Sequence, residues 1–286
     1  MKAPLCRLRV WLVAAAAGVA LTLGSIAIAD TQHFGNRTLY IPNPEEFEPI
    51  SAAAPRYMRA AGAYLPASNR LIEAYAMPND VRGLADGKAV NLERYFQLQA
   101  PRSVDGTPVS ETEFTAAEKE IEAAMGDAIK QTDTGTLLQK GNAEVKSMTA
   151  TDPKIALSGI GYLGVYRREP WALFFTVRSR VEMPGGGGQE LVCAGALALV
   201  NYQLVYLYSY SRYRNEGDRQ WAESALSSWV DAVRGANPND PRVGSKADSS
   251  VGGFSFSSMF KKGLLGGIIG LVVGLIAMIV RKRPNL

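Results

Sequence analysis

The residue types that most often carry enzymatic chemistry are scarce in this sequence of 286 residues. It contains one histidine, His33, and two cysteines, Cys6 and Cys193. Catalytic triads, Cys–His pairs and His-containing metal sites each need a positioned imidazole, and His33 lies near the predicted start of the mature chain, where we expect it to be exposed. The 27 Asp and Glu residues include no pair that stands out as the acid and base of a hydrolase. We therefore predict no catalytic residue, no metal site and no cofactor.

Two groups of residues could bind a ligand. Tyr206, Tyr208 and Tyr210 share one face of a predicted strand, where they could stack against a flat ligand or a sugar, although such a stripe is more often a core face covered by a helix. The turn 167–171, Arg-Arg-Glu-Pro-Trp, could hold an anion or a sugar, although a surface hairpin is the commoner explanation. Cys193 lies in an apolar run and is expected to be a buried, unreactive thiol, with an intermolecular disulfide as the alternative.

The positive charge of the chain is concentrated at its two ends. The formal net charge is +4, with 31 Lys and Arg against 27 Asp and Glu. Eight of the basic residues lie in segments 1–29 and 261–286, which contain no acidic residue. Residues 30–260 therefore carry 23 basic and 27 acidic residues, a net charge of −4. A mildly acidic domain argues against nucleic-acid binding.

The N-terminus has the pattern of a secretory signal peptide. Three basic residues precede the apolar run 10–23, and Ala27 and Ala29 supply the small residues of a cleavage site before Asp30. We predict that residues 1–29 are removed; an uncleaved N-terminal anchor is the alternative.

The C-terminal segment 263–280 contains 18 residues without a charge. A helix of this length crosses a hydrocarbon core of about 30 Å with little tilt. Gly266, Gly270 and Gly274 recur every four residues and would lie on one side of that helix, where they allow close approach of another helix backbone. The pattern indicates packing against a second copy or another membrane helix, unless the glycines reflect only their high frequency in membrane helices.

The two apolar ends together predict a topology. A cleaved signal followed by one span places residues 30–262 on the exported side and residues 281–286 in the cytoplasm. Because only Cys193 remains after cleavage, the exported domain can form no internal disulfide, which is more typical of bacteria than of animal cell surfaces. We predict a single-pass type I protein of the bacterial inner membrane with a periplasmic domain. Residues 236–262, rich in Pro, Asp, Ser and Gly, are expected to be a flexible linker.

Residues 30–235 are predicted to form an α+β domain, an antiparallel sheet with amphipathic helices packed on its faces. The segment 30–66 contains five prolines and is expected to be an extended arm. A helix of about 20 residues should follow the capping-box pattern from Ser110 to Glu113, and a second helix, capped by Asp218, should end at Gly235. Alternating or β-branched runs predict strands near residues 69–77, 94–100, 143–150, 155–167, 171–182, 190–200 and 202–213.

The order of these elements resembles, remotely, the PsbP/Mog1-like α/β/α sandwiches. The resemblance depends on a late β-meander, Trp171–Tyr213, followed by a terminal helix that contains Trp221 and Trp229. It implies an adaptor, assembly or binding module rather than an enzyme. No signature motif accompanies it, so no functional residue is carried over.

These observations favour a membrane-anchored periplasmic interaction or assembly module. The first alternative is a membrane-tethered domain that binds or senses a small molecule of unknown identity, and the second is a carboxylate-dependent hydrolase. A pore is disfavoured because the predicted span has no polar residue to line a channel. The membrane itself, and a second copy or another membrane helix at the glycine face, are the expected partners.

Overall fold

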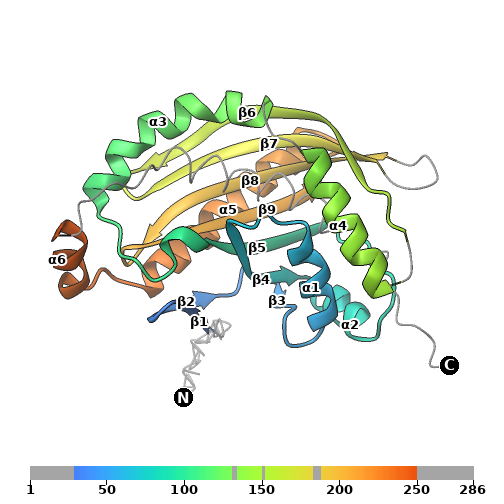
Figure 1. Cartoon of the computed structure of the whole chain (residues 1–286), viewed down its shortest axis with the longest axis horizontal. Coiled ribbons are helices and arrows are strands. Elements are labelled where there is room, and N and C mark those ends of the chain that lie inside the picture. Colours follow the sequence, from blue (N-terminus) through green and yellow to red (C-terminus); the bar gives the residue numbers. More distant parts are fainter. Residues whose placement is uncertain (1–28, 131–133, 150–151, 183–187, 250–286) are drawn as a thin grey trace, which may run out of the picture.

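A seven-stranded antiparallel sheet forms the middle layer of the computed structural model, which describes residues 29–130, 134–149, 152–182 and 188–249 (Figure 1). Every neighbouring pair in the sheet is antiparallel. This architecture confirms the predicted α+β class. The strand order across the sheet is β3 (Glu48–Pro49), β4 (Asn69–Ala76), β5 (Arg94–Pro101), β9 (Gln203–Arg212), β8 (Gly188–Val200), β7 (Ala172–Glu182) and β6 (Ala156–Glu169).

The strands β7, β8 and β9 form the predicted meander, and β4, β5 and β6 lie close to their predicted positions. Successive side chains of a strand point to opposite faces of the sheet. Along β8, Cys193 accordingly belongs to one apolar core, while Val192 and Ala194 belong to the other. The near-continuous burial of β7, β8 and β9 follows because both faces of the sheet are covered.

One face of the sheet is covered by helix α5 (Glu216–Ala236) and by a separate hairpin of β1 (Ala29–Phe34) and β2 (Arg37–Pro42). Trp229 joins the two, because its ring packs in this core and its Nε1 donates a hydrogen bond of 2.8 Å to the carbonyl oxygen of Pro42. The apolar stripe of α5 is thereby buried, as the sequence predicted for its long helices.

The opposite face is covered by three helices, α1 (Pro55–Ala63), α3 (Glu111–Lys130) and α4 (Thr134–Thr149). In Figure 1 they arch over the sheet, with α3 along β6 and with α1 beside α4. Phe114 of α3 and Val145 of α4 are fully buried against the strands. Three shorter helices complete the described chain: α2 (Pro78–Ala85), the 3-10 turn η1 (Arg102–Val104) and α6 (Pro241–Ser249).

Both long helices begin with a capping box. At α3 the Oγ of Ser110 accepts from the Glu113 amide at 3.1 Å, and the Glu113 carboxylate accepts from the Ser110 amide at 2.9 Å, which confirms the predicted start. At α5 the cap is Asn215, and Asp218 is the third helical residue that completes the box. The predicted cap, Asp218, was wrong by three residues, because Asn and Asp side chains can both accept from the free amides at a helix start.

Several predicted elements differ from the structure. Residues 30–66 are not an extended arm, because the β1–β2 hairpin and α1 lie within them. Of the predicted strand 143–150, residues 143–149 are instead the C-terminal part of α4, and residue 150 lies outside the described residues. Residues 241–249 of the predicted linker are helical. In each case local prolines or a short alternation misled the prediction, and contacts made elsewhere in the fold decided the conformation.

The predicted membrane-spanning segment 263–280, with Gly266, Gly270 and Gly274, lies outside the described residues. So do Ala27 and the rest of the predicted signal peptide before Ala29, which is the first residue of β1. Among the helices that the structure describes, none combines the length and the apolar character needed to cross a membrane.

Candidate anion-binding pocket

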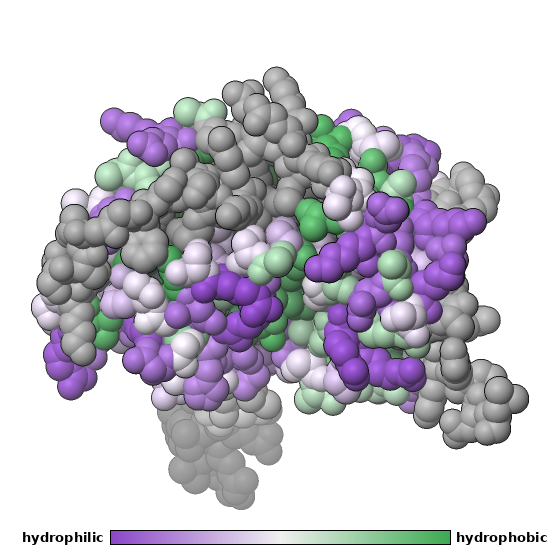
Figure 2. Space-filling view, viewed as in Figure 1, coloured by the Kyte–Doolittle hydropathy of each residue, from purple (hydrophilic) through white to green (hydrophobic). Residues whose placement is uncertain are grey.

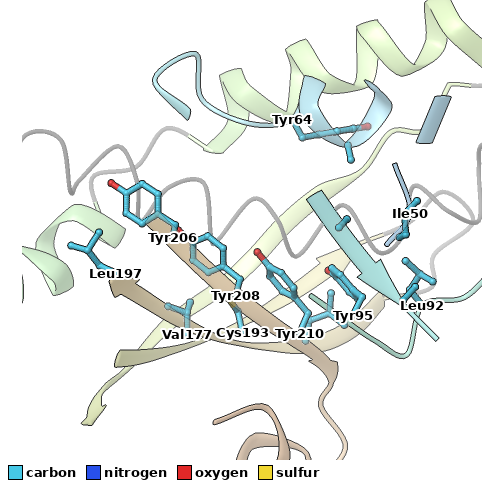
Figure 3. Packing of buried hydrophobic residues seen from close by; sticks show 14 of the residues in the cluster. Ile50, Tyr64, Leu92, Tyr95, Val177, Cys193, Leu197, Tyr206, Tyr208 and Tyr210 are labelled. Atoms are coloured by element: carbon cyan, nitrogen blue, oxygen red, sulfur yellow. The ribbon is translucent and has the colours of Figure 1, made fainter. Parts of the chain in front are cut away.

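The tyrosines proposed as a tentative ligand face are buried in this structure. Tyr206, Tyr208 and Tyr210 are at most 1% exposed, and their rings stand in a row on β9 beneath the helices (Figure 3). The ring of Tyr210 stacks on that of Tyr95 from β5, with centroids 4.5 Å apart. Burial raises the pKa of the Tyr206 and Tyr210 hydroxyls well above the ordinary value. In this structure the three tyrosines are core residues.

A row of buried amides connects these tyrosines to the molecular surface. Gln97 lies opposite Tyr208 in the β5–β9 register, and Gln99 lies opposite Tyr206. The Nδ2 of Asn69 donates to Gln99 Oε1 at 3.2 Å, and Gln99 Nε2 donates to Gln97 Oε1 at 2.9 Å. Hydrogen bonds among buried polar groups hold the first strands of the sheet in register. The outer end of this row, Asn69, lines a surface pocket.

The turn 167–171 is occupied by contacts within the protein. Arg167 forms a bidentate pair with Asp231 of α5, with both distances 2.9 Å. Arg168 pairs with Glu122 of α3, and the ring of Trp171 lies under the guanidinium of Arg234. Because its charges are already paired, the turn holds α3 and α5 to the sheet and offers little to an external anion.

A pocket of about 480 Å³ opens beside α1 and α4. Its walls come from the end of α1, the connection into β4, the η1 turn after β5, and α4. Figure 2 shows hydrophilic residues gathered on the side of the molecule where α1 and α4 lie. The lining residues are Arg59, Gly62, Ala63, Leu65, Pro66, Ala67, Asn69, Arg102, Lys140 and Glu144.

The wall between α1 and α4 depends on a tyrosine that packs on a glycine. Tyr64 follows α1, is fully buried, and lies against Gly141 of α4. Its hydroxyl donates to Asn142 Oδ1 at 2.8 Å, and Asn142 Nδ2 donates to the carbonyl oxygen of Ile155 at 3.0 Å. These contacts fix α4 against α1 and against the start of β6, so they position Lys140 and Glu144 at the pocket.

Arg102 is placed by backbone contacts at the end of the antiparallel β4–β5 pair, where β4 begins and β5 ends. Its backbone amide donates to the carbonyl oxygen of Ser68 at 2.8 Å, and its Nε donates to that of Asn69 at 3.2 Å. One donor of the guanidinium is therefore used to orient the group. An arginine has five such donors in a planar fork, and the remaining donors of Arg102 make no hydrogen bond to the described residues.

Three cations and one carboxylate meet in the pocket. Arg59, Arg102 and Lys140 form no ion pair with any part of the chain that the structure describes. Glu144 lies four residues after Lys140 on the same helix face, but this order of charges is the less favourable one for an ion pair, and no pair between them is present. The pocket thus carries two positive charges in excess.

Other reactive groups in the described chain are occupied or inaccessible. Glu73 is buried, and its carboxylate accepts hydrogen bonds from the amides of Ser51 at 3.0 Å and Ala74 at 2.8 Å and from the Ser51 hydroxyl. Burial raises the pKa of this carboxyl, and those hydrogen bonds partly oppose the rise. Cys193 is 1% exposed, and burial raises the pKa of its thiol. Both groups have structural roles.

No cluster of three or more His, Cys, Asp or Glu side chains with metal-binding geometry occurs within the described ranges. The pocket contains a single carboxylate and no imidazole or thiol, so its chemistry is that of an anion receptor. The sequence analysis missed it, because its residues come from four separate segments and because residues 143–150, which overlap the second half of α4, were predicted as a strand. Two local signals of excess positive charge were present: residues 49–72 contain three arginines, one of them Arg59, and no acidic residue, and residues 94–102 contain two arginines and no acidic residue.

Comparison with known proteins gives a remote structural similarity. No protein-family model matches the chain, and no curated protein matches it. Two matching structures are a point mutant of the protein Mog1, 12% identical with a TM-score of 0.25, and the Ran-binding protein Mog1p of Saccharomyces cerevisiae, 13% identical with a TM-score of 0.23. Each match covers 73% of this chain and 90% of the other. The similarity agrees with the remote resemblance that the order of elements indicated.

Proposed function

We propose that this chain is an exported, membrane-anchored interaction module that binds an anionic group of a partner in the pocket between α1 and α4. The observation that carries the proposal is the meeting of Arg59, Arg102 and Lys140, three cations from three elements that have no ion-pair partner among the described residues. Like charges gathered in one pocket attract an anion, because an anion that binds there removes the repulsion among them. This grouping of cations stands out further in a domain whose net charge is negative.

The sheet edge is a poorer candidate for the interaction surface. The outer strand β6 exposes Leu163 at 49%, and an unpaired edge can accept another strand. However, its pairing with β7 shifts register at three places, and Gly159 and Gly164 have positive φ angles. Such bulges protect an edge against pairing with other chains. The pocket is therefore the better site.

The membrane location is supported by the sequence. The signal pattern of residues 1–29 and the apolar segment 263–280 predict export followed by anchoring in the bacterial inner membrane, with residues 281–286 in the cytoplasm. Residues 250–262 between α6 and the predicted span would then be the tether. A reporter that is active only outside the cytoplasm, fused after residue 249, should be active, and fused after Leu286 it should be inactive.

The glycine face of the predicted span supports a second contact, with another copy or another membrane helix. A Gly270→Ile change should abolish self-association of the span in a membrane two-hybrid assay, because the larger side chain prevents close backbone approach. Unchanged association of that variant would show that the glycines are not an interface.

Site-specific photocrosslinking in native membranes tests the pocket. A photoreactive residue at Ala67, which is exposed and lines the pocket, should give an adduct that disappears when Arg102→Ala and Lys140→Ala are combined. The matched control position is Ser228, exposed on α5 beyond the other face of the sheet. Identical adducts from both positions, or an adduct that persists without the two charges, would contradict a partner site in the pocket.

A further inference from the structure

We infer that the pocket between α1 and α4 accepts a phosphate monoester carried on a small hydroxylated carbon skeleton. The inference rests on the proposed function, in that it names the class of ligand for the same site. It follows from the charge, the donor geometry and the size of the pocket.

The charge of the pocket matches a dianion. Arg59, Arg102 and Lys140 contribute three positive charges and Glu144 removes one. A phosphate monoester carries a charge of about −1.5 to −2 near neutral pH, because its second pKa is about 6. A carboxylate or a phosphate diester carries only one negative charge, so it would neutralise one of the two excess positive charges of the pocket and leave the other. The monoester is therefore the group that balances this site.

The donors of the pocket suit a tetrahedral anion with several oxygens. The Nε of the exposed Arg102 donates to the carbonyl oxygen of Asn69 at 3.2 Å, a contact that favours one orientation of its planar fork. Such a fork binds two phosphate oxygens with charge-assisted hydrogen bonds. Lys140, from α4, and Arg59, from α1, add cations from the two helices that form the sides.

The pocket is larger than a phosphate group needs. Its volume of about 480 Å³ lies in the range of roughly 300 to 1,000 Å³ that is usual for sites of small organic ligands. Leu65 and Pro66 are buried residues of its lining and provide apolar contact for a carbon skeleton. The Glu144 carboxylate has no ion-pair partner in the described chain and can accept hydrogen bonds from hydroxyl groups. Hydroxyls on the ligand would turn this otherwise repulsive residue into a selective contact.

Two sources present this chemistry to an exported protein held near a bilayer: a free organic phosphate and the headgroup of a lipid that ends in a phosphate monoester. Isothermal titration calorimetry on the full mature chain in detergent measures the first, with glycerol 3-phosphate, inorganic phosphate, glycerol and glutarate as probes. We expect glycerol 3-phosphate to bind more tightly than inorganic phosphate, and glycerol and glutarate to bind weakly. The affinity should decrease as ionic strength rises, because the cations are exposed.

Variants of the lining residues assign the binding to the pocket. Arg102→Ala should weaken glycerol 3-phosphate binding by about 10- to 100-fold, since charge-assisted hydrogen bonds are lost, and Arg102→Lys should restore part of it. Glu144→Gln should strengthen inorganic phosphate binding but reduce the preference for glycerol 3-phosphate over inorganic phosphate. Arg56→Ala is the matched control, because Arg56 is an exposed α1 arginine that does not line the pocket. Circular dichroism confirms that each variant is folded.

The lipid source is tested in nanodiscs that contain phosphatidic acid, a monoester, or phosphatidylglycerol, a diester. A weaker apparent affinity for glycerol 3-phosphate in the phosphatidic acid discs alone would identify the headgroup as the occupant, and equal affinities would identify the free ligand; both results support the inference. Equal binding by the Arg102→Ala and Arg56→Ala variants, or tighter binding of glutarate than of glycerol 3-phosphate, would overturn it. If no phosphate probe binds but the charge-dependent crosslink at Ala67 forms, the ligand class is wrong while the interaction module stands.

Discussion

The ring of Tyr64 lies directly against Gly141, so that α1 and α4 meet with no side chain between the tyrosine and the helix backbone. A Cβ atom added at Gly141 would lie 2.5 Å from the Cγ atom of Tyr64, much closer than real Cβ contacts. The same tyrosine donates its hydroxyl hydrogen to Asn142, the next residue of α4. This contact forms the wall that places Lys140 and Glu144 at the pocket.

Gly141→Ala should therefore destabilise the protein, by about 1 to 3 kcal/mol, because the ring and the helix must separate. Gly62→Ala is the matched comparison: Gly62 is also helical, and no atom lies within 4 Å of its added Cβ. That variant should gain up to about 1 kcal/mol from higher helix propensity. Urea unfolding measures both, and equal stability of the two variants would contradict the packing described.

Tyr75→Phe should leave the free energy of unfolding unchanged or raise it by about 1 kcal/mol. The hydroxyl of Tyr75 is buried and has no hydrogen-bond partner among the described residues, and an unsatisfied buried polar group is unfavourable. Tyr64→Phe should instead cost about 1 kcal/mol, because it removes the hydrogen bond to Asn142. Thermal unfolding of the two variants side by side makes the comparison, and a larger loss in Tyr75→Phe than in Tyr64→Phe would show that Tyr75 has a partner.

Glu73 should make the stability of the protein fall as the pH rises above about 4.5, the ordinary pKa of its carboxyl. Burial raises the pKa of Glu73 in the folded state, so between the unfolded and the folded pKa the folded protein binds more protons than the unfolded chain, and the free energy of unfolding decreases with increasing pH. Its contribution is fully present below the unfolded pKa and is lost through the folded one.

Glu73→Gln removes this titration. The unfolding free energy of the wild type should therefore rise relative to that of the variant as the pH falls toward 4.5. Ser51→Ala, which removes a hydrogen bond that lowers the Glu73 pKa, should extend the pH-dependent range upward. Urea unfolding across pH 4 to 8 provides the curves. A difference between wild type and Glu73→Gln that stays constant with pH would show that the carboxyl is not perturbed.

Cys193 should resist thiol reagents in the native protein and react rapidly in denaturant. It is 1% exposed, and burial raises its pKa, whereas the thiolate is the reactive form. Labelling the Cys6→Ser variant with a chromogenic disulfide at pH 8, with and without urea, measures the difference. Native labelling at the rate of a free thiol would contradict the buried position, and native labelling that tracks the unfolding rate would agree with it.

The parts of the fold that the sequence determined are those set by local patterns. Runs of apolar, β-branched and aromatic residues located the strands of the β7–β9 meander, because such residues favour strands that are covered on both faces. The capping box of Ser110 and Glu113 located the start of α3, because both of its hydrogen bonds lie within four residues. Charge and hydropathy at the two ends also predicted export and anchoring without reference to any fold.

Segments with two possible periods were decided by tertiary contacts. Residues 143–150 alternate like a strand, but Leu138, Val145 and Met148 also have helical spacing, and packing on the sheet selected the helix. The early hairpin depends on the close approach of Gly35 and Gly106, whose φ angles are both positive. A Cβ added to either glycine would lie 3.0 Å from the Cα atom of the other. No local pattern encodes a contact between residues so distant in sequence.

The candidate site is formed only by the tertiary structure, because its residues come from segments that are distant in sequence. The sequence identified the tyrosine row and the turn 167–171 as binding candidates, but the fold buries the first and pairs the charges of the second. Conversely, Arg59, Arg102 and Lys140 are unremarkable in sequence and become a site only when α1, η1 and α4 converge. Residue type and local spacing set which elements form, whereas the distance between charges depends on how those elements pack, because electrostatic interactions act through space and not along the chain.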